Sequence, residues 1–197
     1  MSFAEPVVLT GELVVHEPLQ SSDHDELVEA ASDGRLWTLS YTRVPRPDQM
    51  RYSIDRSLAL QAEGLLVPFT VRQRHGGRVI GQTTYCNIDA EHRRLEIGGT
   101  WNAQSAHRTG TNTESKSLLL SHAFDQLHCI AVEFRTHWLN RQSRQAIERL
   151  GAKQDGILRS HRIMPDGTLR DTVVYSIIEH EWPAIRNELQ RRLADHR

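Results

Sequence analysis

Several features that assign a chain to a special class of protein are scarce in this sequence. It has only two cysteines, Cys86 and Cys129, and they lack the CxxC spacing of a zinc or redox site. It has no hydrophobic run of the roughly 20 residues that a membrane-spanning helix needs. Its first residues include Glu5 and no apolar core of a signal peptide. These absences predict a cytoplasmic protein with reduced thiols and no membrane partner.

A strong charge of one sign is also absent. The 24 Lys and Arg residues and the 25 Asp and Glu residues give a net charge of −1. Electrostatics therefore gives no reason to expect nucleic acid as a partner. The 11 histidines show neither the HExxH motif nor i, i+4 pairs, so no metal site is predicted. With 197 residues, 38% of them hydrophobic, the chain is expected to form one domain over residues 1–197.

The pattern of apolar residues predicts an α+β fold with a mixed sheet. Strands are expected at residues 13–17, 67–74, 79–88, 94–101, 130–136, 157–164 and 171–178. Helices are expected after residue 23 through 30, and at 48–62, 114–127, 140–150 and 182–193. The second to fourth strands read as an antiparallel meander. The strand at 94–101, the helix after it and the strand at 130–136 read as a parallel βαβ crossover.

The segment His107–Thr113, with the sequence HRTGTNT, connects a predicted strand to a predicted helix. A glycine such as Gly110 in a short loop before a helix leaves backbone N–H groups pointing outward, beside the positive end of the helix dipole. This arrangement predicts an anion site, for which phosphate is the usual ligand. Because glycine before a helix is common, a cap without a ligand is the ordinary alternative.

Glu96 alternates with Leu95 and Ile97 along the strand at 94–101. If the two apolar residues face the core, Glu96 faces the opposite side of the sheet. A partly buried carboxylate at such a position can act as a general base. A solvated surface glutamate is the ordinary alternative.

A Glu-bearing strand, a phosphate-type loop, a parallel partner strand and a helix headed by Asn140 follow one another in this order. Over nearly the whole chain they resemble the GNAT superfamily of acyl-CoA-dependent N-acyltransferases, and most closely its RimJ/RimL-like branch. The resemblance implies a mostly antiparallel sheet of roughly seven strands, flanked by helices. It also implies that the parallel strand pair splays apart to bind acyl-CoA, with the pyrophosphate on the loop amides.

The resemblance implies further roles for matching residues. Asn140 is expected to bind the pantetheine arm, in addition to capping its helix. Ser143 is expected to donate a hydrogen bond to the departing thiolate, because the family's usual tyrosine position holds Ile147. The loop departs from the family pattern at His107 and Asn112, which stand where Gln or Arg and Gly or Ala are usual. The residues expected to contact acyl-CoA are Trp101, Arg108, Thr109, Gly110, Thr111, Asn112, Thr113, Asn140 and Ser143.

The acceptor side is expected to include Trp37, Tyr41 and Arg43, which lie between the first two helices, and His137 at the end of the parallel partner strand. Core packing is the ordinary alternative for the aromatic residues. Glu96 is expected to bind the acceptor amine or to deprotonate it.

The expected activity is transfer of an acyl group, acetyl above all, from acyl-CoA to a primary amine in one ternary complex. Neither cysteine is placed as a nucleophile, so no covalent enzyme intermediate is expected. The amine is either a protein N-terminus or a small molecule, and the resemblance implies a homodimer. Two other functions stay open: a non-catalytic acyl-CoA-binding module, and a nucleotide-binding protein that uses the same loop.

Overall fold

The structure is a computed structural model that describes residues 3–38, 41–42 and 44–195. Eight strands form one sheet in the order β1-β2-β3-β4-β5-β6-β8-β7. The strands are β1 (Leu9–Thr10), β2 (Val14–Pro18), β3 (Leu66–Gln73), β4 (Val79–Asp89), β5 (Arg94–Asn102), β6 (Ala131–His137), β7 (Lys153–Ile163) and β8 (Leu169–Ile178). The helices are α1 (His24–Ser32), α2 (Met50–Ala62), α3 (Thr111–Ser121), α4 (Arg141–Arg149) and α5 (Trp182–Ala194).

The sheet is mostly antiparallel, and β5 with β6 is its parallel pair. The predicted α+β class, the β3–β4–β5 meander and the β5–α3–β6 crossover are confirmed. The sheet has one strand more than predicted, because β1 consists of only two residues and is too short to show an alternating pattern. Helix α3 begins at Thr111, three residues before the predicted start, and a π-helical segment (His122–Gln126) follows it.

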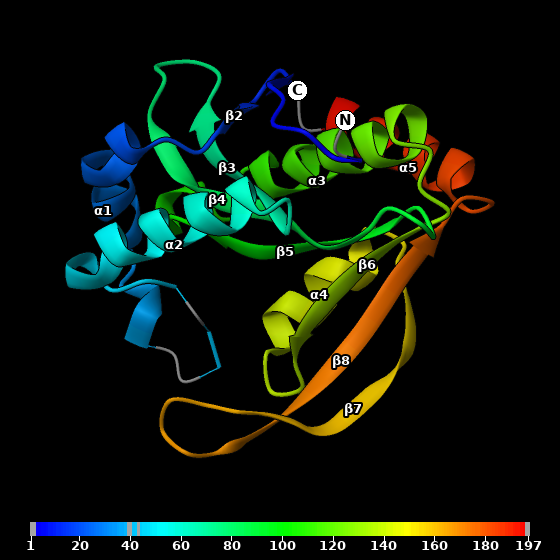
Figure 1. Ribbon diagram of the computed structural model, residues 1–197. Helices are drawn as coiled ribbons and strands as arrows, with labels where there is room; N and C mark the ends of the chain where they lie inside the picture. Colours follow the sequence, from blue (N-terminus) through cyan, green and yellow to red (C-terminus); the bar gives the residue numbers. More distant parts are fainter. Residues whose placement is uncertain (1–2, 39–40, 43, 196–197) are drawn as a thin grey trace.

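The helices cover two different parts of the sheet (Figure 1). Helices α3, α4 and α5 bury apolar residues such as Leu119, Ile147 and Leu189 in the main apolar cluster, which includes Leu95 and Ile97 of β5. Helices α1 and α2 contact β4 and β3 and form a second cluster. The sheet therefore has a filled face under α3–α5, and a second face that α1 and α2 cover at the β3–β4 end.

The parallel strands pair over only a short length. Arg94–Glu96 of β5 pairs with Ala131–Glu133 of β6, whereas β5 continues to Asn102. A β-bulge lies beyond the paired part, where two residues of β5, Gly99 and Thr100, stand opposite Thr83 of β4. Gly99 has a φ of +60°, which glycine adopts without a steric penalty. Because a bulge bends its strand and increases its twist, the edge of β5 beyond Glu96 is left without a neighbouring strand.

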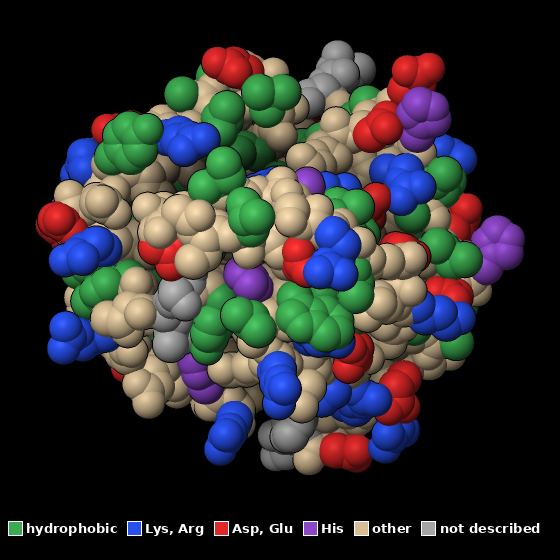
Figure 2. Space-filling view, turned by 90° about the horizontal axis from the view of Figure 1, so that it is seen from below, with side chains coloured by type: hydrophobic (Ala, Val, Ile, Leu, Met, Phe, Trp, Pro, Cys, Tyr) green, Lys and Arg blue, Asp and Glu red, His purple; other side chains and the backbone are tan. Residues whose placement is uncertain are grey.

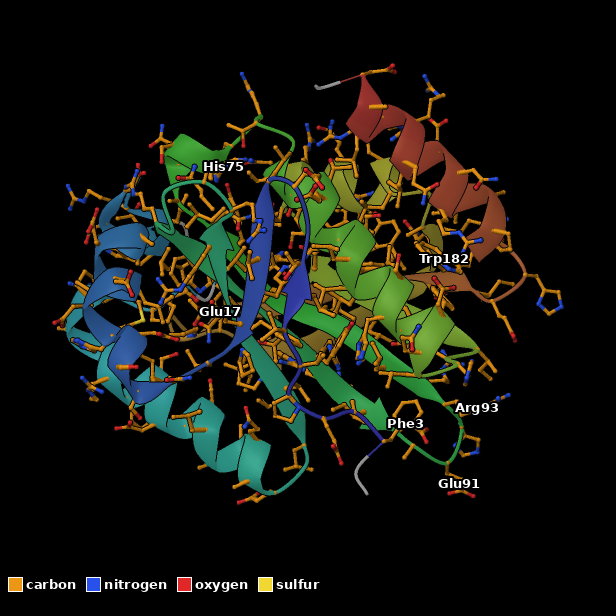
Figure 3. All side chains as sticks on the ribbon, turned by 90° about the horizontal axis from the view of Figure 1, so that it is seen from above. Phe3, Glu17, His75, Glu91, Arg93 and Trp182 are labelled. Atoms are coloured by element: carbon orange, nitrogen blue, oxygen red, sulfur yellow. The ribbon has the colours of Figure 1, made fainter. Side chains whose placement is uncertain are left out.

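The N-terminal segment that includes β1 and β2 lies beside α3 when the molecule is seen from above (Figure 3). The buried carboxylate of Glu114 joins them, because it accepts hydrogen bonds from the backbone N–H groups of Glu12, Leu13 and Val14 at 3.0, 2.7 and 2.8 Å. This contact fixes the helix that begins at the predicted anion loop.

The hairpin of β7 and β8 forms the lower edge of the molecule in Figure 1. It exposes four large apolar side chains, those of Leu158, Ile163, Leu169 and Ile178. In the view from below (Figure 2), hydrophobic and basic side chains lie close together. Within the described ranges, no helix is both long enough and apolar enough to cross a membrane.

Candidate functional site

The loop before α3 has the geometry of an anion site. Gly110 is the N-cap of α3 with a left-handed φ of +82°, and Arg108 has a φ of +62°. Within the described part of the chain, the backbone N–H groups of Thr111, Asn112 and Thr113 have no hydrogen-bond partner. These donors and the positive end of the helix dipole point to the same place, which suits a phosphate group.

The loop's own side chains hold its shape. The hydroxyls of Thr109 and Thr111 both donate to the carbonyl oxygen of Ala106, at 2.7 and 3.0 Å. The Nε2 atom of His107 lies 3.0 Å from the carbonyl oxygen of Asn102, at the end of β5. The threonine hydroxyls are thus occupied, so an anion would meet the backbone amides of this loop.

A pocket of about 180 Å³ adjoins the loop. Arg149 of α4 and Arg192 of α5 line it, together with Asn112 and Thr113. Arg192 is paired with Glu188 at 2.7 Å, whereas Arg149 is exposed and has no ion-pair partner within the described residues. Neither arginine could be predicted from the sequence, because only the packing of α4 and α5 brings them to the loop. Guanidinium groups beside free amides extend the site for a ligand with several phosphates.

Trp101 follows the bulge, and its side chain is not available to a ligand at the open edge of β5. It is 6% exposed and belongs to the second apolar cluster, with Met50 and Ile54. Its predicted contact with a ligand can therefore involve only the backbone of the β5 edge.

Helix α4 follows the C-terminal end of β6. The Oδ1 atom of Asn140 accepts a hydrogen bond from the backbone N–H of Ser143 at 3.0 Å. Asn140 is thus the predicted N-cap, and its Nδ2 group has no partner within the described chain. The hydroxyl of Ser143 is also without a partner there, and the residue is half-buried. The amide and the hydroxyl are both free to bind a ligand. Ile147, one turn further on, is buried in the main cluster.

Glu96 lies where its alternation with Leu95 and Ile97 predicts. The two apolar residues are 1% and 3% exposed in the main cluster, and Glu96, on the opposite face, is 7% exposed. Its Oε2 atom accepts a hydrogen bond from Nδ2 of Asn87 at 2.6 Å. Its Oε1 atom has no hydrogen-bond partner within the described residues and points toward Gly98, where a Cβ would approach it to 2.8 Å. One oxygen is therefore held, and the other is free at the point where β5 leaves β6.

A second carboxylate, Glu133, is the register partner of Glu96 across the parallel strands. Arg94 donates to it at 2.7 Å, and Arg135 donates to it at 2.8 Å while lying 3.5 Å from Glu96. Burial raises the pKa of Glu96 above its ordinary value, although Arg135 and Asn87 oppose the rise. Burial also acts to raise the pKa of Glu133, but its two arginine partners outweigh this effect and lower it. Of the two carboxylates, Glu133 is therefore the one that favours its ionised form, and Glu96 is the one better suited to take up a proton.

Four residues around Glu96 were not among the predicted site residues: Asn87, Arg94, Glu133 and Arg135. The register between β4, β5 and β6 brings them to Glu96, and that register cannot be read from one strand alone. Asn87 carried one signal: it lies near the end of the predicted strand at 79–88, and asparagine tolerates the left-handed φ of +47° that this residue adopts.

The acceptor-side candidates come from two segments of the chain, the connection between α1 and α2 and the end of β6. Trp37 is half-buried against the second apolar cluster, and Tyr41 is half-buried; Arg43 lies outside the described residues. The Nδ1 atom of His137 accepts the backbone N–H of Leu139 at 3.0 Å, so only its Nε2 group can meet a ligand. Burial lowers the pKa of His137, and Arg170 adds to the effect. These contacts give Trp37 and His137 structural roles, and the acceptor role of all three candidates stays a prediction.

No group of three or more metal-binding side chains is present in the described ranges. Burial raises the pKa of Cys86 to about 12 and that of Cys129 to about 12, so neither thiol has nucleophilic character at neutral pH.

Comparisons with known proteins show which family the chain is similar to. The acetyltransferase (GNAT) domain family matches residues 14–153. A Bacillus subtilis protein, YdaF, named provisionally as a ribosomal N-acetyltransferase, is 30% identical over 108 residues. The matched stretch is 55% of this chain and spans 58% of that relative.

Solved structures extend the likeness to almost the whole chain. A protein of T. thermophilus, provisionally named an acetyltransferase, is 32% identical with a TM-score of 0.83, and the match covers 96% of this chain and 98% of that one. A ribosomal-protein-S5-alanine acetyltransferase from Vibrio fischeri is 16% identical with a TM-score of 0.71, over 89% of this chain and 98% of that one. At this identity the second likeness shows the fold alone.

Proposed function

The chain belongs to the GNAT acetyltransferase family, and on that premise we propose that it is an N-acetyltransferase of the RimJ/RimL-like branch that uses acetyl-CoA and a primary amine in one ternary complex. One observation carries the proposal. The open edge of β5 begins beside the free oxygen of Glu96 and leads to the loop at Gly110. A single extended ligand with a reactive thioester at one end and phosphates at the other fits both ends of this path.

The residues present suit acyl-CoA. The free amides after Gly110 and the guanidinium of Arg149 suit its phosphates. The backbone of the β5 edge and the Nδ2 group of Asn140 offer hydrogen bonds to the amide groups of a pantetheine arm. Acetyl-CoA supplies the acetyl group as a thioester, which an amine can attack without a metal or a covalent enzyme intermediate.

Glu96 takes the proton that the amine must lose. Acceptor amines are mostly protonated at neutral pH, and Oε1 of Glu96 is free to accept that proton directly or through water. The bond that forms joins the amine nitrogen to the acetyl carbon, and the bond that breaks joins that carbon to sulfur. The Ser143 hydroxyl donates a hydrogen bond to the sulfur as negative charge develops on it. As the C–S bond breaks, the nitrogen loses its second proton to solvent, and the thiolate takes up one proton from solvent. The proton on Glu96 then returns to solvent, so each turnover releases one proton overall.

We propose the α-amine of a protein N-terminus as the acceptor, because YdaF bears the name of a ribosomal N-acetyltransferase. A small amine is the alternative. A non-catalytic module is disfavoured by the free carboxylate oxygen and the free hydroxyl, which such a module would not need. A nucleotide-binding protein would not need the open strand edge.

The test measures binding and thiol release together. Coenzyme A should raise the melting temperature of the wild type, because a ligand that binds the folded state stabilises it by mass action. Gly110→Asp should abolish the shift, since it adds a Cβ and a negative charge at the anion loop. Gly64→Asp is the matched control and should keep the shift, because Gly64 also has a left-handed φ, +72°, but precedes β3 at the other end of the meander. If coenzyme A left the melting temperature of the wild type unchanged, the proposal would be refuted. Tighter binding of ATP than of coenzyme A would favour the nucleotide-binding alternative.

Turnover is measured as thiol release from acetyl-CoA with N-terminal peptides and small amines as acceptors. Glu96→Gln keeps the size of the side chain and should lower turnover by roughly a hundredfold, as expected for a lost general base. The loss should shrink at high pH, where the amine deprotonates unaided. Glu133→Gln, the neighbouring carboxylate, should retain most of the turnover. Full activity of Glu96→Gln would show that solvent takes the proton.

A further inference from the structure

Lys116 is a buried lysine that the proposed chemistry does not use. It lies on the second turn of α3 and is 5% exposed. Its Nζ atom donates to the Oγ1 atoms of Thr83 at 3.0 Å and Thr100 at 2.6 Å, and these two hydroxyls lie 2.8 Å apart. Among the described residues, no carboxylate pairs with this amine. Lys116 is therefore held by hydroxyl groups alone in that part of the chain.

Burial of such an amine costs free energy. Loss of hydration lowers the pKa of Lys116 to about 7, so the neutral and charged forms coexist near neutral pH, and either form can donate both hydrogen bonds. A methionine has a similar length and would fill the same space without this cost. Unlike methionine, the amine forms two directional hydrogen bonds. Its role therefore depends on the two hydroxyl groups that it binds.

Those groups belong to the bulge that opens the β5 edge. Thr100 is a bulged residue of β5, and Thr83 stands opposite it on β4. Lys116 follows Gly110, the N-cap of α3, by six residues on the same rigid helix. One side chain thus joins the helix that bears the anion loop to the strand segment that forms the open edge.

The two polar residues that precede Lys116 attach α3 to other elements. Glu114 binds the amides of the N-terminal segment, and the hydroxyl of Ser115 lies 2.8 Å from Nε2 of His16 on β2. Burial, together with the charge of Lys116, lowers the pKa of His16 to about 3, which keeps its ring neutral. These contacts secure α3 against β2, whereas Lys116 reaches across to β5.

We propose that Lys116 is a positioning residue of the acyl-CoA site, which holds the Gly99–Thr100 bulge against α3 so that the open β5 edge stays aligned with the loop at Gly110. The inference rests on the proposed function, because this alignment matters only for a ligand that spans both parts. The nucleotide end of such a ligand meets the loop, and its pantetheine arm meets the edge that Lys116 controls.

The test substitutes Lys116→Met and compares two probes. The KM for acetyl-CoA should rise about tenfold, which corresponds to the contribution of about one hydrogen bond to the binding free energy. The kcat should change far less. Adenosine 3′,5′-bisphosphate, which lacks the pantetheine arm, should bind the variant and the wild type equally. The melting temperature should stay the same or rise, because an apolar side chain replaces a buried amine. A purely structural role would instead lower stability and weaken both probes together.

Thr100→Val provides a second variant that removes the hydrogen-bond acceptor from an exposed position of the bulge and leaves the core intact. It should raise the KM for acetyl-CoA in the same way. The double variant should show less than the product of the two single effects, because both substitutions remove the same contact. Lys153→Met is the matched control, since Lys153 is the only other lysine and its side chain is 75% exposed.

Unchanged acetyl-CoA affinity in both Lys116→Met and Thr100→Val would overturn the inference while leaving the proposed function intact. Equal loss of affinity for acetyl-CoA and for the bisphosphate would also overturn it. If the wild type itself bound no coenzyme A, the proposed function and this inference would fail together, and the melting experiment above detects that outcome first.

Discussion

Glu114 is expected to be one of the most sensitive positions for stability in this protein. Its carboxylate is buried and accepts three backbone N–H groups, two of them at Oε2 and one at Oε1. Gly11 leaves room for this carboxylate, because a Cβ at that position would collide with Oε2. Glu114→Gln keeps the shape but replaces one oxygen with an NH₂ group, which faces an N–H donor.

The size of the effect follows from these three bonds. A hydrogen bond to a charged group contributes about 1.5–3 kcal/mol, and one between neutral groups about 0.5–1.5 kcal/mol. If the remaining oxygen of the glutamine takes the place of Oε2, two bonds weaken by about 1 kcal/mol each, and the third is lost at about 1.5 kcal/mol. The free energy of unfolding should therefore fall by about 3–4 kcal/mol. For a chain of this size, that corresponds to a melting temperature lower by roughly 6–16 °C.

Urea denaturation followed by far-UV circular dichroism measures the change. Glu12→Gln is the matched control, because Glu12 is exposed and offers only its backbone N–H to the contact. It should alter the free energy of unfolding by less than about 0.5 kcal/mol. If Glu114→Gln stayed within about 1 kcal/mol of the wild type, water would be satisfying the three amides, and the carboxylate would not be a structural anchor.

Two further substitutions test the proposed chemistry. Asn87→Gly keeps the left-handed backbone but removes the hydrogen bond that lowers the pKa of Glu96; that pKa should rise, so the acid limb of the kcat/KM profile should move to higher pH. An unmoved acid limb would mean that Glu96 does not set it. Ser143→Ala should lower kcat about tenfold or more while acetyl-CoA affinity stays nearly constant, because the hydroxyl acts as charge develops on sulfur. Weaker binding with unchanged kcat would assign Ser143 to ligand binding.

The local features of the site could be predicted from the sequence, because they depend on short spacings. Alternation alone gave the correct face for Glu96, since Leu95 and Ile97 are both buried in the main cluster. The glycine in a loop before a helix marked Gly110, which adopts the left-handed conformation at the helix N-cap. The resemblance to the GNAT superfamily, which rests on these motifs and their order, is confirmed by the family match over residues 14–153.

Features that depend on pairing between strands could not be predicted in this way. The bulge inserts one residue into β5, which moves Trp101 to the face covered by α1 and α2 and explains why its side chain lies in the second apolar cluster. Strand alternation without the bulge places it on the other face. Asn87 and Arg135 reach Glu96 only through the registers of β4 and β6, and Arg149 reaches the loop only through the packing of α4.

The bulge also determines how the open edge of β5 is positioned relative to the anion loop at Gly110. Without the inserted residue, β5 would continue beside β6, and its backbone groups would be used in the ladder. The insertion frees that edge and turns Thr100 toward α3, where the amine of Lys116 holds it. The same strand segment therefore both exposes hydrogen-bonding groups for a ligand and is fixed relative to the anion loop. A substitution that restores regular pairing, such as deletion of Thr100, should close the edge and abolish coenzyme A binding more completely than the loss of any one side chain that lines it.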